Sequence, residues 1–258
     1  MTDFFSKMNE DYVQKHFPDG SVLESARKTV KRRNIGAIFF FALFLVGSLW
    51  GLVWSIGRTI ESASNGDDTL GVGIAICVFF GLVSLGLFAL LYFLIKENRK
   101  KHSDYIADSA KHSKLLESEV EEFERQVLAT DCYILKLTSG LDRVLSNATN
   151  PDGLLTRDYI YLADPAQTIM RIDQLKACCF SDYTYYISVG NKQKKIHCLS
   201  IGLIASNGVS VCSDTTKEAG EALMNLLKER NSEMDTNNGE VLKEGEFDKY
   251  KKRILGEK

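Results

Sequence analysis

Two long stretches without a charged residue most constrain what this chain can fold into. They run from Ile35 to Gly57 and from Leu70 to Ile95. The hydrocarbon core of a bilayer is about 30 Å thick and is crossed by roughly 20 helical residues, so each stretch is long enough to span it. Because backbone groups in hydrocarbon must bond within their own segment, we expect two helices that make residues 35–95 a transmembrane hairpin.

Basic residues flank this hairpin at both of its outer ends. They are Arg27, Lys28, Lys31, Arg32 and Arg33 before the first stretch, and Lys96, Arg99, Lys100 and Lys101 after the second. The connecting loop, residues 58–69, carries three acidic residues against one arginine. Because Lys and Arg are retained in the cytoplasm, the pattern predicts a two-span protein of the cell membrane with both termini cytoplasmic.

Small residues recur at every fourth position on both stretches. One ridge is formed by Gly47, Gly51 and Ser55, and the other by Gly73, Cys77 and Gly81. Such ridges let helix backbones approach closely. They predict packing between the two helices of one hairpin or, alternatively, a homodimer seam. Since neither stretch contains Asp, Glu, Lys, Arg or His, the pair is typical of an anchor rather than of a transporter or channel.

The composition and the motifs narrow the class of protein. The formal charge of −2 gives no basic excess that would indicate a nucleic-acid partner. The six cysteines include no C-x-x-C pair, and the sequence contains no nucleophile elbow, phosphate-binding loop or H-E-x-x-H motif. We therefore predict no catalytic, metal-binding or cofactor-binding residues, no cofactor, and a protein that is not an enzyme.

Two helical regions are expected beside the hairpin. Residues 1–34 form a cytoplasmic amphipathic segment with a short helix over residues 4–17, and a second helix begins at Ser21, which makes a capping box with Glu24. Residues 96–129 continue the second span as a helical stalk, with side chains at the three-and-four spacing of a heptad. The later turns of the stalk are expected to pack on the following domain, and dimerisation through the stalk is the alternative.

After Asp131 the hydrophobic period changes from 3.6 to 2, which predicts a β-domain over residues 130–230. The expected strands are residues 133–138, 154–163, 168–172, 175–181, 183–189, 194–204 and 209–212, with a hairpin turn at Asn207-Gly208. A single amphipathic helix follows, capped by Thr215 with Glu218. The tail, residues 231–258, is polar and either docks a short helix through Phe247, Tyr250 and Ile254 or is disordered.

These stretches carry a resemblance to a known group of proteins. The segments "GLLTRDYIYLADPAQTIMRIDQLKACCF", "YYISVGNKQKKIHCLSIGL" and "EAGEALMNLLKER" resemble bacterial membrane proteins that pair a transmembrane hairpin with a pleckstrin-homology-like domain. The likeness covers residues 130–230 and rests on strand order and the Leu-Thr-x-x-Tyr-Ile pattern. It implies an α+β membrane protein with an antiparallel β-barrel or sheet closed by a helix, which serves as a membrane-tethered binding or scaffolding module.

The favoured function is a membrane-anchored cytoplasmic module without catalytic activity. Its partners are the lipid bilayer and a protein, or a second copy of the chain, which contacts an exposed sheet edge or the groove beside the closing helix. The first alternative is a module that senses anionic lipid. Its headgroup contacts would be Arg27, Lys28, Lys31, Arg32, Arg33, Arg99, Lys100 and Lys101, together with the hairpin lysines Lys192, Lys194 and Lys195. The second alternative is a membrane enzyme whose site the sequence does not reveal.

Overall fold

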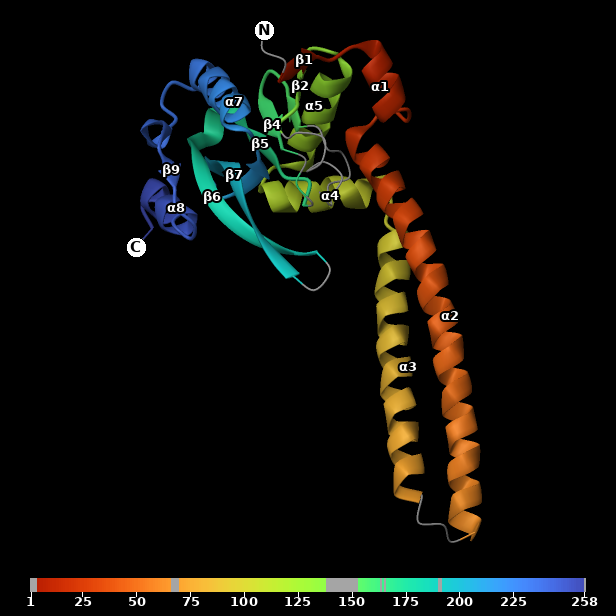
Figure 1. The fold of residues 1–258 in the computed structure, drawn as a ribbon. Helices are drawn as coiled ribbons and strands as arrows, with labels where there is room; N and C mark the ends of the chain where they lie inside the picture. Colours follow the sequence, from red (N-terminus) through yellow and green to blue (C-terminus); the bar gives the residue numbers. More distant parts are fainter. Residues whose placement is uncertain are drawn as a thin grey trace. The chain divides into compact units, whose positions relative to one another are not determined.

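The structure is a computed structural model that describes residues 4–65, 70–137, 153–162, 164, 166–189 and 192–257 (Figure 1). The chain divides into two units. One unit combines Met1–Ala26 with His102–Lys258, and the other is Arg27–Lys101. Secondary structure is of the α+β class, with helices and two antiparallel-rich sheets. The expected α+β class is therefore confirmed, and the two units are described separately below.

The second unit consists mainly of two long helices, α3 (Leu70–Asn98) and the part of α2 (Val22–Asn65) that follows Ala26. Both are long and apolar enough to cross a membrane. Helix α2 extends past Gly57, where the sequence predicted the first span to end, because no glycine or proline interrupts residues 58–65. The polar loop was expected to begin at Arg58, and its residues 66–69 lie outside the described part of the chain.

A five-stranded antiparallel sheet forms part of the first unit. Its strands, in spatial order, are β1 (Phe5–Lys7), β2 (Tyr133–Leu135), β3 (Gly153–Leu155), β4 (Tyr159–Tyr161) and β5 (Ile169–Arg171). The predicted helix over residues 4–17 is wrong at its start, because residues 5–7 pair with β2 and place Phe5 opposite Leu135. Helix α1 (Glu10–His16) begins only after Asn9, whose side chain accepts a hydrogen bond from the Tyr12 amide at 2.8 Å.

The segment predicted as one strand over residues 154–163 is instead a tight hairpin. Strands β3 and β4 are antiparallel, and the chain reverses between them at residues 156–158. The Thr156 hydroxyl accepts a hydrogen bond from the Tyr159 amide at 3.0 Å, which closes the turn. The reversal exposes Arg157 at the turn, whereas alternation along a single strand would have placed it on a sheet face.

A second sheet has the strand order β8-β7-β6-β9. Its strands are β6 (Leu175–Val189), β7 (Lys192–Ala205), β8 (Ser210–Asp214) and β9 (Val241–Leu242), and η1 (Ile172–Gln174) leads into it from β5. Strand β9 runs parallel to β6, and the other pairs are antiparallel. The two segments predicted over residues 175–181 and 183–189 are one continuous strand. Over the described residues the strands form two sheets and no closed barrel, so the expected barrel is not seen.

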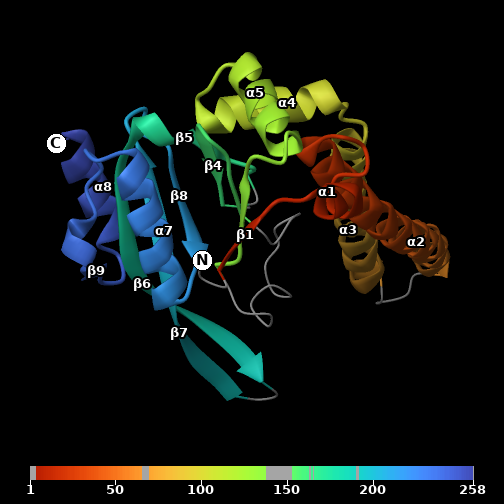
Figure 2. The same ribbon diagram turned by 90° about the horizontal axis from the view of Figure 1, so that it is seen from above.

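Helices cover both faces of this second sheet (Figure 2). Helix α7 (Lys217–Arg230) packs Leu223 against Phe180 and Ile201 on one face. Helix α8 (Phe247–Leu255) packs Tyr250 against Cys179 on the other face, after the short turn η2 (Asn237–Gly239). The tail therefore docks a helix, which is the first of the two outcomes that its sequence allowed. Helix α7 is capped by Thr216, whose hydroxyl accepts from the Ala219 amide at 3.2 Å, and not by Thr215 as expected.

The predicted stalk is not a single helix. After α3 ends, the chain forms α4 (His102–Ser113) and α5 (Glu117–Leu128), joined by a reversal at Lys114, whose φ of 51° is left-handed. Most of the residues at heptad spacing are buried in the domain core, and Val120, Phe123 and Val127 are each 0% exposed. Leu116, at the start of α5, is the exception and is 68% exposed. The buried residues pack on the first sheet, because a buried sheet face offers these side chains more contact than a short two-helix seam would.

Candidate binding site

A charged pocket opens on the first unit where the first sheet meets the end of α7. Its volume is about 550 Å³, which lies within the range of ligand-binding pockets. Among the described residues, three arginines and three aspartates line it with charge, namely Arg157, Arg171, Arg230, Asp131, Asp158 and Asp173. Tyr133 and Ile172 also line it. The pocket thus gathers side chains from β2, the β3–β4 turn, β5 with η1, and the last turn of α7.

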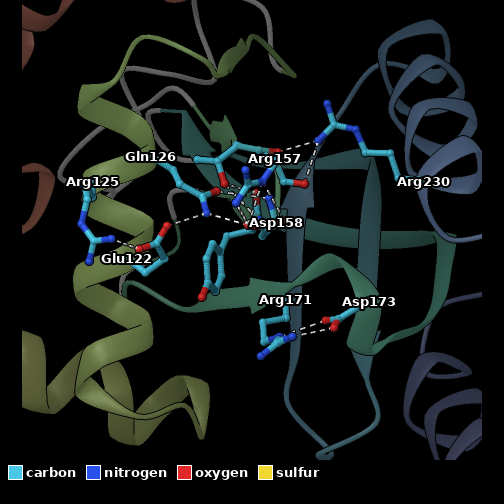
Figure 3. Close-up of polar contacts among 10 residues, drawn as sticks. Glu122, Arg125, Gln126, Arg157, Asp158, Arg171, Asp173 and Arg230 are labelled. Atoms are coloured by element: carbon cyan, nitrogen blue, oxygen red, sulfur yellow. Dashed lines mark hydrogen bonds and ion pairs between the residues drawn. The ribbon is translucent and has the colours of Figure 1, made fainter.

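Arg157 and Asp158 form a fixed pair at the β3–β4 turn (Figure 3). Arg157 donates through Nη2 to Asp158 Oδ2 at 2.9 Å and through Nε to Oδ1 at 3.3 Å. Gln126 of α5 also donates to Asp158 Oδ2, at 2.6 Å. The hydrogen bond from Arg157 and, secondarily, the one from Gln126 hold the pKa of the Asp158 carboxyl below its ordinary value, so the carboxylate stays charged.

Arg171 has its guanidinium occupied on every nitrogen. Nε and Nη2 donate to the two oxygens of Asp173 at 3.0 and 2.6 Å, and Nη1 donates to Glu119 of α5 at 2.8 Å. The bidentate bond from Arg171 lowers the pKa of Asp173. The pKa of Glu119 is also lowered, first by the backbone amide of Leu116 and then by Arg171. Arg171 therefore ties β5, η1 and α5 together.

Arg230 differs from the other two arginines because its described partners are backbone carbonyls. Its Nη1 donates to the Thr156 carbonyl at 2.5 Å and lies 3.5 Å from the Arg157 carbonyl (Figure 3). The next residue, Asn231, donates its side-chain amide to the carbonyls of Ile172 and Leu175 at 2.8 and 2.9 Å. These bonds fix the end of α7 over the pocket. Among the described residues, Arg230 has no carboxylate partner.

The small residues predicted to pack the hairpin occupy different environments in the second unit. Gly51 lies against the Phe80 ring, and a Cβ there would be 2.8 Å from it. A Cβ at Gly73 would lie 2.5 Å from the Thr59 hydroxyl. The Cys77 thiol donates to the Ser55 hydroxyl at 3.3 Å. Over the described part of the chain, a Cβ added at Gly47 or Gly81 would meet no atom within 4 Å beyond its own helix backbone.

The predicted headgroup residues lie at the outer ends of α2 and α3. Arg27 donates to the Lys100 carbonyl at 3.4 Å, so the two basic runs meet at one end of the helix pair. Lys100 itself pairs with Glu97 at 2.8 Å. The exposed members are Lys28, Lys31, Arg32, Arg33, Arg99 and Lys101. Their contact with lipid stays a prediction.

The pocket residues were missed by reasoning from sequence. Arg157 and Asp158 fell inside a predicted strand, and Arg230 fell at the edge of a predicted domain. A usable signal was present, because the polar triplet Thr156-Arg157-Asp158 interrupts an otherwise apolar run and is a turn composition. Nothing in the sequence around Arg230 indicates that its side chain contacts this turn.

Comparisons with protein-family models, with curated proteins and with solved structures found no match to this chain. The class of protein is therefore given by its own structure. It is an α+β protein with two helices long and apolar enough to cross a membrane and with a charged pocket on its other unit.

Proposed function

We propose that the protein is a membrane-anchored, non-catalytic binding module. Helices α2 and α3 anchor it in the cell membrane with both termini in the cytoplasm, and the unit that carries the two sheets binds a protein partner. The observation that supports this most directly is the pocket of about 550 Å³, in which the described residues contribute three guanidinium groups and three carboxylates. Such groups recognise the charged side chains of a partner.

The helix pair supports an anchoring role. The two helices are joined by hydrogen bonds between uncharged side chains, such as the bond of 2.8 Å between the Ser48 and Ser84 hydroxyls. Interhelical hydroxyl bonds of this kind hold membrane helices together without placing a charge in hydrocarbon. The basic residues at the ends of both helices favour a cytoplasmic location for those ends.

The lining of the pocket favours a protein partner over an anionic lipid. Binding of a polyanionic headgroup needs an excess of positive charge, but the three arginines face three aspartates here. Two of the arginines are also held by neighbouring carboxylates. The basic residues beside the spans are then part of the anchor and its orientation rather than of a sensor.

The test is a crosslinking pull-down from native membranes with the full chain as bait. Arg230→Ala is compared with Arg125→Ala, which removes an exposed arginine whose described ion pair is with Glu122 of its own helix. We expect one specific protein to be recovered with the wild type and with Arg125→Ala, and at least tenfold less with Arg230→Ala. Recovery of no protein above background would overturn the proposed function. Equal recovery by all three baits would exclude the pocket as the contact surface.

A further inference from the structure

The three pocket arginines differ in how much of each guanidinium is already used. In Arg171 the nitrogens Nε, Nη1 and Nη2 each donate to a carboxylate, so every nitrogen is engaged. In Arg157 the nitrogens Nε and Nη2 donate to Asp158. In Arg230 only Nη1 has acceptors among the described residues, and both acceptors are backbone carbonyls. Among the arginines that the structure describes in the pocket, Arg230 is thus the one whose whole Nε–Nη2 edge is open, whereas Arg157 leaves Nη1 alone without a described acceptor.

That open edge has a defined chemistry. The Nε–Nη2 edge of a guanidinium presents two parallel N–H groups that match the two oxygens of one carboxylate. Arg230 is also held in place, because Nη1 bonds the Thr156 carbonyl and Asn231 bonds the carbonyls of Ile172 and Leu175. Part of the side-chain entropy that binding would otherwise cost is already lost. Arg230 is therefore prepared to receive an acidic group.

The same pocket contains one acid that no hydrogen bond or ion pair to a described residue holds in place, although its charge acts on the guanidinium of Arg157. Asp131 lines the pocket, and within the described residues it makes no hydrogen bond or ion pair, whereas Asp158 and Asp173 are each held by an arginine. After the internal pairs are removed, the described lining presents one open cation at Arg230 and one open anion at Asp131. A ligand that complements both must carry one acidic and one basic group.

We propose that the pocket recognises a protein segment in which an acidic side chain lies close to a basic one, the acid on Arg230 and the base on Asp131. This inference rests on the proposed function and specifies the chemistry of its partner. Purely acidic segments and polyphosphates are disfavoured, since they would meet three carboxylates. Tyr133 and Ile172 give the wall an apolar surface for the side-chain stems.

The test uses the full chain in detergent and four dye-labelled peptides, with acetylated and amidated ends. Each contains one Glu and one Lys, separated by zero to three glycines, and binding is measured by fluorescence anisotropy. Peptides with Glu→Gln or Lys→Gln serve as single-charge controls, a peptide with Lys→Glu is the doubly acidic control, and phosphoethanolamine is added as a competitor. We expect at least one mixed-charge peptide to bind about tenfold more tightly than both of its single-charge forms.

Variants of the protein test which pocket residue binds the acidic side chain of the peptide and which binds the basic one. Arg230→Gln should remove the advantage of the Glu side chain, so that the mixed-charge peptide binds no better than its Lys-only form. Asp131→Asn should likewise remove the advantage of the Lys side chain. Arg125→Gln, at an exposed arginine outside the pocket, should leave both advantages unchanged.

Three outcomes would overturn the inference. The first is equal binding of mixed-charge and single-charge peptides, and the second is tighter binding of the doubly acidic peptide. The third is tighter binding of phosphoethanolamine than of any peptide, seen as displacement of the labelled peptides. A partner that is recovered in the pull-down in an Arg230-dependent way, while no peptide binds, would leave the proposed function standing and remove only the charge-pair inference.

Discussion

The Ser21 hydroxyl donates a hydrogen bond of 2.5 Å to the carboxylate of Glu124, a residue 103 positions further along the chain. The same carboxylate oxygen accepts the backbone amide of Leu23 at 2.9 Å. Glu124 is only 7% exposed, so α5 places a buried negative charge at the first turn of α2. The free amides and the dipole of a helix N-terminus stabilise a carboxylate there. This contact fixes where the long helix α2 begins within the first unit.

Removing that carboxylate should destabilise the first unit. Glu124→Ala leaves the Ser21 hydroxyl and the Leu23 amide without their acceptor, at a cost of about 1–3 kcal/mol in the free energy of unfolding. Glu124→Gln keeps an acceptor oxygen and should cost less. Thermal unfolding of the full chain in detergent, followed by near-ultraviolet circular dichroism, measures the difference. Glu121→Ala, at an exposed position of the same helix, should leave the midpoint unchanged, and an equal loss in that variant would contradict the assignment.

Contact between α8 and the second sheet depends on the absence of a side chain at Gly202. A Cβ added there would lie 2.3 Å from the Phe247 ring. Gly202→Ala should therefore displace α8, with a loss of about 1–3 kcal/mol in the free energy of docking. Faster trypsin cleavage at Lys249, Lys251, Lys252 and Arg253 would report the displacement.

A double variant tests the cause of this effect. Phe247→Ala alone should also loosen α8, but adding Gly202→Ala to it should have little further effect, because the ring that clashes is gone. Cleavage rates that multiply in the double variant would show that the two residues act independently.

The ion pairs of the pocket should make the first unit sensitive to acid. The pKa of Asp173 is lowered in the folded protein by Arg171, and that of Asp158 by Arg157. A carboxyl whose pKa is lower when folded contributes stability above its unfolded pKa of about 3.9, and loses that contribution as the pH falls through the folded pKa. In Arg171→Gln, stability should therefore fall less steeply than in the wild type as the pH drops from about 5 through the folded-state pKa of Asp173. Parallel pH profiles of melting temperature for wild type and variant would contradict this.

The sequence predicted those parts of the fold that depend on local composition. A run without charge is sufficient to predict a long apolar helix, and the 3.6 period was sufficient for α7. For α8 the spacing of Phe247, Tyr250 and Ile254 indicated a docked helix only as one of two alternatives, the other being disorder. The register of β1 was not predictable in this way, because Phe5 gains its strand conformation from pairing with Leu135, far away in the chain. Phe123 likewise sits at a heptad position, and only the presence of the first sheet decides that it packs there.

The candidate site could not be predicted from local sequence patterns, because it too depends on contacts between residues far apart in the chain. Arg157, Arg171 and Arg230 come from three separate parts of the chain, and of these only Arg157, within the polar triplet 156–158, is distinguished by the residues around it in the sequence. Their convergence follows from the β3–β4 reversal and from the anchoring of Asn231 on η1 and β6. A pattern search reads neighbours in sequence, whereas these contacts join residues more than 50 positions apart.

Cysteine crosslinking can decide between the two arrangements that the glycine ridges allow. The Ser48 and Ser84 hydroxyls lie 2.8 Å apart, so cysteines at both positions are within reach of a disulfide in a single chain. The variant carries Ser48→Cys and Ser84→Cys, and Cys77→Ser removes the native thiol of α3. Oxidation with copper-phenanthroline should then form a disulfide that links α2 to α3. After trypsin cleavage at Arg58, the two fragments should stay joined on a non-reducing gel. Leu49→Cys with Leu85→Cys, at positions 45% and 69% exposed, should give separate fragments. A crosslinked product of twice the chain mass from the first pair would instead favour a homodimer seam, because the two serines would then face a second copy.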